Sequence, residues 1–288
     1  MEGRTVVITG GNAGIGKETA IGLAALGARV VITSRDEQRG ARAVAEISAR
    51  SGSSDVEVLR LDLASFASIR AFAAALLDRT DAIDVLVNNA GLILRKRTLT
   101  ADGLEATFGV NHVGHFLLTN LLLDCLRASA PARVVVVASD AHESAKRGLD
   151  FDDLQSEGGY RWGKVYGKSK LANIYFAREL ARRLDGSGVT SNSLHPGFVR
   201  SEFGQGGDLG SLYGFGLKYL AAPFAISQEE GARTSIHVAS APELDGATGG
   251  YYVKSRLASP SRVALDDDAA RRLWDVSERL VGGPLQSS

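Results

Sequence analysis

The 288-residue chain carries 33 basic and 33 acidic side chains, so its formal net charge is zero. It therefore lacks the basic field that would hold a nucleic-acid backbone and the acidic tail that would solvate a partner, and we expect no nucleic-acid binding. The length is compatible with two domains, but α/β sheets of this size often form one unit, so we expect a single domain over residues 1–288.

The chain begins almost directly with an apolar strand pattern at residues 5–9, and no run of about 18 apolar residues follows. We therefore expect no signal peptide and no membrane span. The one cysteine, Cys125, cannot form an internal disulfide and lies in an apolar run typical of a buried helix face. A soluble, cytoplasmic protein is expected, in which Cys125 is structural rather than nucleophilic.

Short β-branched runs alternate with longer segments of helical period. This alternation predicts repeated β-α-β units, and so a Rossmann-type, doubly wound parallel sheet of seven strands with helices on both faces. The predicted strands are 4–9, 28–33, 56–61, 83–87, 133–138, 189–195 and 249–253. The predicted helices are 15–26, 37–51, 66–79, 103–128, 163–185, 228–240 and 267–281. Two segments, 140–162 and 198–227, leave the carboxyl edge of a strand, where long loops usually cover an active site.

The first predicted strand leads into a glycine-rich turn that opens a helix. Glycines let the backbone approach a pyrophosphate, whose charge then meets the free N–H groups and positive dipole end of that helix. Glycines also serve ordinary turns, but the position within a β-α-β unit favours a dinucleotide site. The candidate contacts in this turn are Gly10, Asn12, Ala13, Gly14, Ile15 and Gly16.

The end of the second predicted strand bears on the choice between NAD and NADP. A carboxylate there would bind both ribose hydroxyls of NAD, whereas a small hydroxyl followed by arginine leaves room for the 2′-phosphate of NADP. Ser34 and Arg35 occupy this position, which favours NADP(H). The alternatives are that Arg35 is a solvated surface charge and that Asp36, next along, acts as the acid. Lys17 is either a further charge for the phosphate or an ordinary solvated lysine.

Two further candidate contacts follow the third and fourth predicted strands. Asp62, followed by Leu63, is placed either to hydrogen-bond the adenine or to cap the next helix. After Asn88, the small residues Ala90 and Gly91 let a loop lie close to the ribose and nicotinamide. Their order along the chain, rather than any one of them, is what favours a dinucleotide site.

A tyrosine and a lysine stand four positions apart in the helix predicted from residue 163, so Tyr166 and Lys170 share one face. A phenol is a poor proton donor or acceptor at neutral pH until a cation stabilises its anion, and Lys170 supplies that cation. The Lys170 ammonium can also hold the nicotinamide ribose hydroxyls, so Tyr166 and Lys170 are candidate cofactor contacts as well as catalytic residues. Ser139, which ends the fifth predicted strand, can hold the substrate oxygen that Tyr166 protonates. Asn111, a polar residue in an apolar helix, either bridges a water to Lys170 or satisfies a kinked backbone.

Three histidines, His112, His115 and His142, lack a shared spacing suited to zinc, so we expect surface or core roles for them and no metal site.

These residues, in this order, resemble the short-chain dehydrogenase/reductase family over residues 4–254. The motifs are Thr9-Gly10-x-x-x-Gly14-Ile15-Gly16, Asn88-Asn89-Ala90-Gly91, Asn111, Ser139, Tyr166-x-x-x-Lys170 and Pro196-Gly197. The resemblance implies a catalytic tetrad of Asn111, Ser139, Tyr166 and Lys170. It also implies cofactor contacts at the glycine turn, Arg35, Asp62, Leu63, Asn88, Ala90, Pro196, Gly197 and Val199, with Ser201 near the carboxamide.

Within that family, residues 14–20, 111–116 and 169–173 resemble the retinol dehydrogenase group, which includes the WW-domain-containing oxidoreductases. This group prefers NADP(H) and acts on lipophilic alcohols and carbonyls. The sequence lacks the N-terminal hydrophobic anchor of the membrane-bound members, which argues against a retinoid substrate and a membrane location.

We therefore expect an NADPH-dependent reductase acting on a lipophilic ketone or aldehyde. The aromatic, glycine-punctuated segment 198–227 is expected to close over the substrate as a lid, unless its aromatic side chains pack against the sheet or a partner subunit. A catalytically silent, dinucleotide-binding regulator or scaffold of the same fold is the alternative function. Monomer, homodimer and higher homo-oligomer all remain open.

Overall fold

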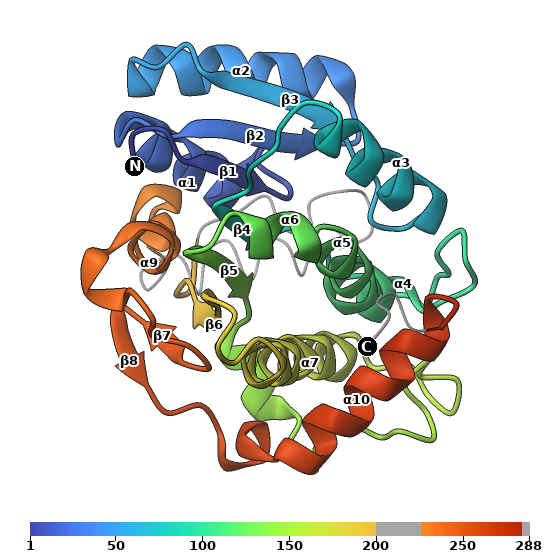
Figure 1. Cartoon of the computed structure of the whole chain (residues 1–288). Helices are drawn as coiled ribbons and strands as arrows, with labels where there is room; N and C mark the ends of the chain where they lie inside the picture. Colours follow the sequence, from blue (N-terminus) through green and yellow to red (C-terminus); the bar gives the residue numbers. More distant parts are fainter. Residues whose placement is uncertain (200–225, 284–288) are drawn as a thin grey trace.

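The computed structural model describes residues 1–199 and 226–283. Their strands form one sheet in the order β3-β2-β1-β4-β5-β6-β7-β8 (Figure 1). The strands are β1 (Thr5–Ile8), β2 (Arg29–Ser34), β3 (Val56–Arg60), β4 (Val85–Asn88), β5 (Ala132–Val137), β6 (Val189–His195), β7 (Tyr251–Val253) and β8 (Arg256–Ala258). Neighbouring strands from β3 to β7 are parallel, which confirms the predicted doubly wound α/β sheet.

The described residues form eight strands rather than the predicted seven, because β8 was not predicted. β8 pairs antiparallel with β7 through a turn at Lys254 and Ser255, whose φ angles are 51° and 58°. A two-residue hairpin requires positive φ at its centre, usually at Asn-Gly or Asp-Gly. Because this turn carries neither pair and β8 is three residues long, the sequence offered no signal for it.

The helices divide between the two faces of the sheet because successive strand side chains point to opposite sides. On one face, Val6 and Ile8 pack with α1, α2 and α9. On the other, Val7 packs in a cluster that includes α3, α5, α7 and α10. The long helices are α1 (Gly14–Ala25), α2 (Glu37–Ser51), α3 (Phe66–Leu77), α5 (Gly114–Leu121), α7 (Trp162–Arg183), α9 (Gln228–Ser240) and α10 (Asp267–Leu280).

The predicted helix 103–128 is instead a series of shorter pieces. Glu105 accepts hydrogen bonds from the first amides of α4 (Ala106–Phe108), and a π-helical turn, η1 (Gly109–Val113), leads into α5. A break at Leu122 then separates α5 from α6 (Leu123–Ala128). Nearly every residue from 106 to 120 is buried, so the apolar pattern runs all round the helix and gives no sign of a widened turn.

Cys125 lies on α6 and is only partly buried, so the expected buried position is wrong. Its Sγ lies 3.7 Å from the Asp81 carbonyl oxygen, and partial burial raises the pKa of the thiol. A raised pKa reduces the thiolate fraction at neutral pH, in agreement with a cysteine that is not a nucleophile.

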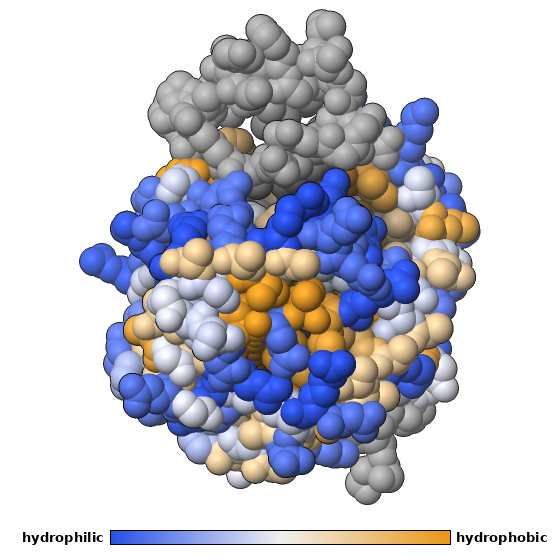
Figure 2. All heavy atoms as spheres, turned by 90° about the horizontal axis from the view of Figure 1, so that it is seen from above, coloured by the Kyte–Doolittle hydropathy of each residue, from blue (hydrophilic) through white to orange (hydrophobic). Residues whose placement is uncertain are grey.

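Seen from above Figure 1, the surface is mostly hydrophilic around a central hydrophobic hollow (Figure 2). Over residues 1–199 and 226–283, no helix combines the length and apolar character needed to cross a bilayer.

An aromatic cluster behind the sheet joins three of these helices. Phe116 of α5 is fully buried, and its ring centroid lies 4.8 Å from that of Trp274 on α10 and 5.7 Å from that of Phe176 on α7. We expect Phe116→Ala to lower the free energy of unfolding by about 3–5 kcal/mol, because the cavity cannot collapse between three helices. Urea denaturation monitored by circular dichroism would measure this change.

The control is Leu257→Ala on β8, where the side chain is 71% exposed and the expected change is below about 0.5 kcal/mol. Equal effects of the two substitutions would contradict the assigned core.

Candidate active site

The predicted site residues converge at the carboxyl ends of the parallel strands. Thr9 follows β1, Asn88 ends β4, Ser139 lies just beyond β5 and Pro196 follows β6. In a doubly wound sheet this edge, at the reversal of strand order between β1 and β4, is where ligands bind. The sequence-based placement of the site at this edge is therefore consistent with the topology.

Ser139 and Tyr166 meet across this edge. Ser139 caps the short helix η2 (Asp140–Ser144): its Oγ accepts from Ala141 N at 3.1 Å and donates to Asp140 Oδ1 at 3.0 Å. It also hydrogen-bonds the phenol of Tyr166 on α7. Burial raises the pKa of Tyr166 to about 12, an effect that the Ser139 hydrogen bond opposes and the Asp140 charge reinforces. At neutral pH the phenol therefore keeps its proton and can act as an acid.

Lys170 is buried one helical turn beyond Tyr166. Its Nζ donates to the Val137 carbonyl oxygen at 3.0 Å and lies 5.6 Å from the centre of the Tyr166 ring. Burial lowers the pKa of Lys170 to about 8. The side chain is therefore mostly charged at pH 7, beside the phenol whose anion it is expected to stabilise.

Asn111 belongs to the π-helical turn, and its side chain hydrogen-bonds the backbone of Leu92 and the Ser169 hydroxyl. Its Oδ1 accepts from Leu92 N at 2.8 Å, and its Nδ2 donates to Leu92 O and to Ser169 Oγ, each at 3.0 Å. Of the two predicted roles, these contacts favour satisfaction of an irregular backbone. Asn111 meets α7 through Ser169, the neighbour of Lys170 in the sequence.

The glycine turn fits a dinucleotide pyrophosphate. The first turn of α1 has no side-chain cap and no acidic residue, so its N–H groups and positive dipole end remain available to an anion. A Cβ on Gly14 would meet no other atom within 4 Å, which shows open space there. A Cβ on Gly16 would lie 2.5 Å from the Gly10 carbonyl oxygen, so only glycine permits this close packing. This turn would hold the pyrophosphate of NAD(P), and the cofactor would supply or accept a hydride through its nicotinamide ring.

At the tip of β2, the two candidate cofactor contacts, Asp36 and Arg35, have different surroundings. Asp36 caps α2, with its Oδ1 accepting from Arg39 N at 2.8 Å, whereas Arg35 is exposed. Ser34 is buried, and its hydroxyl donates to the Asp36 carbonyl oxygen at 2.7 Å. Lys17 pairs with Glu46, with 2.7 Å between Nζ and each carboxylate oxygen, so its charge is neutralised within the protein. The suggested use of Lys17 at a phosphate is not supported.

The remaining cofactor candidates differ in accessibility. Asp62 is partly exposed, and its Oδ1 accepts from Ala64 N, while Ser65 rather than Asp62 caps α3. Leu63 and Asn88 have buried side chains, and Asn88 Nδ2 donates to Thr119 at 2.8 Å. The partly exposed candidates are Asn12, Ile15, Ala90, Gly91, Pro196, Gly197 and Val199, and Ala13 is exposed. Ser201 and most of the predicted lid, residues 200–225, lie outside the described residues.

Ser139 has two polar neighbours that were not predicted from the sequence, Asp140 and His195. The Asp140 carboxylate accepts a hydrogen bond from the Ser139 hydroxyl, and the Asp140 backbone N–H donates to His195 Nδ1 at 3.2 Å. Asp140 follows Ser139 directly, so adjacency was an available signal. His195 ends β6, and only the pairing of β6 with β5 brings it close.

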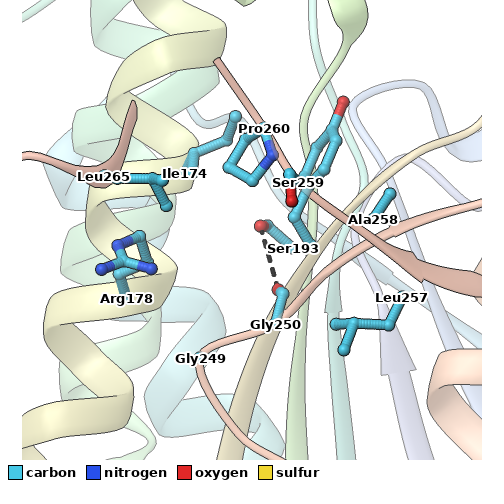
Figure 3. Close-up of a pocket in the computed structure, with 11 residues that line it drawn as sticks. Ile174, Arg178, Ser193, Gly249, Gly250, Leu257, Ala258, Ser259, Pro260 and Leu265 are labelled. Carbon is cyan, nitrogen blue, oxygen red and sulfur yellow. Dashed lines mark hydrogen bonds between the residues drawn. The ribbon is translucent and has the colours of Figure 1, made fainter. Parts of the chain in front are cut away.

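One cavity lies away from this edge of the sheet. A cavity of about 400 Å³ lies between α7 and the β7–β8 hairpin, lined among others by Arg178, Ser193 and Leu257 (Figure 3). It contains no member of the predicted tetrad. Among residues 1–199 and 226–283, no three His, Cys, Asp or Glu side chains are grouped to hold a metal ion.

A glycine turn after the first strand, at the same edge of the sheet as a serine, a tyrosine and a lysine, is typical of a nicotinamide-dependent oxidoreductase of alcohol and carbonyl groups. The family model described as "short chain dehydrogenase" matches residues 4–150. The chain belongs to the short-chain dehydrogenase/reductase family and, within it, to the retinol dehydrogenase-like group.

The relatives cover nearly the whole chain. Human retinol dehydrogenase 12 is 48% identical over 282 residues, and human retinol dehydrogenase 14 is 44% identical over 295 residues. Each alignment covers 98% of this chain and 87% of the relative. An uncharacterized protein of Mycobacterium paratuberculosis matches with a TM-score of 0.78 and 34% identity, over 99% of this chain and 96% of that one.

A second solved structure, the Pseudomonas aeruginosa RhlG/NADP active-site complex, matches with a TM-score of 0.68 and 29% identity. The match covers 87% of this chain and 94% of that one.

The lowered pKa of Lys170 predicts a pH dependence. Lys170 is charged below about pH 8 and loses its proton as the pH rises through that value. Because the neutral amine no longer stabilises the phenolate, we expect kcat/KM for the carbonyl substrate, at saturating NADPH, to fall about tenfold per pH unit above pH 8. Steady-state rates between pH 6 and 10 would measure the profile.

Lys170→Arg is the control, since a guanidinium stays charged over this range and any residual activity should be flat. A wild-type profile without a descending limb up to pH 10 would contradict the lowered pKa.

Proposed function

We propose that this protein is an NADPH-dependent reductase that transfers a hydride to a lipophilic ketone or aldehyde, with the reverse oxidation of the alcohol available at the same site. The observation that carries the cofactor choice is at the tip of β2. There Arg35 is exposed, while the carboxylate of Asp36 accepts from the first turn of α2. An acid occupied as a helix cap is a poor partner for the ribose hydroxyls of NAD, and an exposed guanidinium suits the 2′-phosphate of NADP.

The proposed substrate class rests on the relatives and on the short-chain motifs. Retinol, named in the curated relatives, is a lipophilic alcohol. Phe198, which follows the Pro196-Gly197 motif, is 49% exposed at the carboxyl end of β6. An exposed aromatic ring beside the predicted site can contact an apolar substrate, and its burial would then contribute to binding.

In the proposed reaction, Ser139 holds the substrate carbonyl oxygen next to the Tyr166 phenol. Tyr166, whose raised pKa keeps it protonated, gives its proton to that oxygen as the carbonyl carbon is reduced. Lys170 then stabilises the phenolate with its ammonium until the proton is replaced. The Asn111 side chain bonds both Leu92 and Ser169, and so fixes the Leu92 loop against α7.

Tyr166→Phe should lower kcat by about 10²- to 10⁴-fold, because it removes the acid while leaving the ring. The NADPH dissociation constant should stay within about twofold of the wild type, since the substitution removes a hydroxyl that acts on the substrate. NADPH absorbance with a panel of aldehydes and ketones would measure turnover, and fluorescence would measure binding.

Full turnover by Tyr166→Phe would refute the assigned role. A wild-type protein that binds NADPH but oxidises it with none of the carbonyl compounds would instead favour the alternative, a silent dinucleotide-binding scaffold.

Arg35→Ala should reduce the preference for NADPH over NADH by about ten- to hundredfold, because a charge-assisted contact to the 2′-phosphate is lost. Dissociation constants for both cofactors would give the ratio. Arg42→Ala is the matched control: it removes the same charge from an exposed position on α2 and should leave the ratio unchanged. An unchanged ratio for Arg35→Ala would show that the 2′-phosphate is bound elsewhere.

A further inference from the structure

A buried histidine joins the turn after β1 to the π-helical turn that carries Asn111. His115, on α5, is 1% exposed, and its ring lies between the turn after β1 and the π-helical turn η1. Its Nε2 lies 2.9 Å from Thr9 Oγ1, and its Nδ1 lies 3.1 Å from the Asn111 carbonyl oxygen. One imidazole therefore bridges the residue before the glycine turn and a member of the predicted tetrad.

Counting donors and acceptors fixes the protonation of this ring. Thr9 Oγ1 accepts from Asn89 N at 2.9 Å and from Ala90 N at 3.0 Å, which uses both of its lone pairs. Its proton must then be donated, and His115 Nε2 at 2.9 Å is closer than the Val87 carbonyl oxygen at 3.3 Å. Because the Asn111 carbonyl can only accept, Nδ1 carries the proton of His115.

A protonated ring would not fit this arrangement. A second N–H, on Nε2, would point at a Thr9 oxygen that already accepts two hydrogen bonds. Burial lowers the pKa of His115 to about 4, and the nearby Lys170 charge contributes in the same direction. The neutral Nδ1–H tautomer is therefore the resting form at pH 7.

We propose that His115 is a positioning residue whose neutral Nδ1–H tautomer couples the cofactor-binding loops to the catalytic end of the site. Through Nε2 it holds the Thr9 hydroxyl that anchors the Asn89–Ala90 loop, and through Nδ1 it holds the carbonyl of Asn111. The inference rests on the proposed function for its effect on turnover, but its effect on cofactor binding requires only the dinucleotide site.

His112 offers a matched comparison one turn earlier in the chain. It is equally buried, but its Nε2 lies 2.8 Å from Ser277 Oγ on α10. Because Ser277 donates its own proton to Leu273 O, His112 must donate from Nε2, which is the opposite tautomer. His112 Nδ1 has no partner among the described residues. Substituting His112 thus perturbs a buried imidazole without touching Thr9 or the Asn111 carbonyl.

Two substitutions of His115 separate its two contacts. In His115→Gln, the side-chain oxygen can replace Nε2 and accept from Thr9, but nothing donates to Asn111. We expect NADPH and NADH affinities within about twofold of the wild type and kcat lowered about three- to tenfold. In His115→Asn, the amide can replace Nδ1 and donate to Asn111, but the Thr9 contact is lost. We expect both dissociation constants to rise about three- to tenfold, with kcat within about twofold of the wild type.

The experiment measures both cofactor affinities by fluorescence, kcat at saturating cofactor, and thermal stability for His115→Gln, His115→Asn and His112→Gln. A role in stability alone predicts that all three variants lose stability while affinity and kcat stay unchanged, and this result would overturn the proposal. So would the same pattern of affinity and kcat in both His115 variants. If no carbonyl substrate is reduced by the wild type, the proposed function fails, and the affinities still decide the Thr9 contact.

Nitrogen-15 NMR of the wild-type protein tests the tautomer without any substitution. At pH 7 we expect the proton on Nε2 in His112 and on Nδ1 in His115. His142, also 1% exposed, should give a second Nδ1–H signal, because its Nδ1 lies 2.7 Å from the Ser139 carbonyl oxygen and its Nε2 accepts from Ser261 N. Correlation of each ring with its own backbone resonances separates His115 from His142. An imidazolium or an Nε2–H tautomer at His115 would contradict the proposal even if every variant failed to fold.

Discussion

The carbonyl oxygen of Val137, at the end of β5, accepts hydrogen bonds from Lys170 Nζ at 3.0 Å and from Asn173 Nδ2 at 3.2 Å. These donors come from successive positions on one face of α7, so they fix both the height and the rotation of that helix against the sheet. Tyr166 lies one turn earlier on the helix, and Ser139 lies two residues beyond Val137 on the strand. A buried ammonium needs an acceptor, and satisfying it with this carbonyl also brings the phenol to the serine.

Burial has opposite effects on the two ionisable groups that this arrangement brings together. It raises the pKa of Tyr166 and lowers the pKa of Lys170, because in each case the neutral form is favoured. The phenol is thereby kept protonated well above neutral pH. The ammonium of Lys170, in contrast, has a pKa of about 8. Near neutral pH, a change in the charge of the site therefore comes mainly from Lys170.

Most of the sheet could be predicted because the buried parallel strands form continuous β-branched runs, and because their carboxyl ends must meet at one edge. Thr9, Asn88, Ser139 and Pro196 could therefore be placed together from strand order alone. The antiparallel strand β8 could not, since its turn lacks the usual residues. The π-helical turn at Asn111 was equally hidden, because a segment buried on all sides shows no periodicity.

The individual partners of polar side chains were harder to predict than the elements. The pairing of Lys17 with Glu46 joins α1 to α2 and depends on how those helices pack. The bonding of His115 to Thr9 joins residues 106 positions apart. Nothing in the local sequence distinguishes such a histidine from one that fills the core, as His112 does.

Because Asp36 caps α2, its carboxylate affects two separate properties: the stability of that helix and the proposed preference for NADPH. As long as the carboxylate holds the amide of Arg39, it stabilises the start of α2, and its Oδ1 is already occupied by a hydrogen bond. A lineage that exchanged one nicotinamide cofactor for the other by recruiting this acid would loosen the helix at the same moment. Arg35, in contrast, is exposed and holds no helix end in place among residues 1–199 and 226–283, so its substitution can alter cofactor preference without loosening α2.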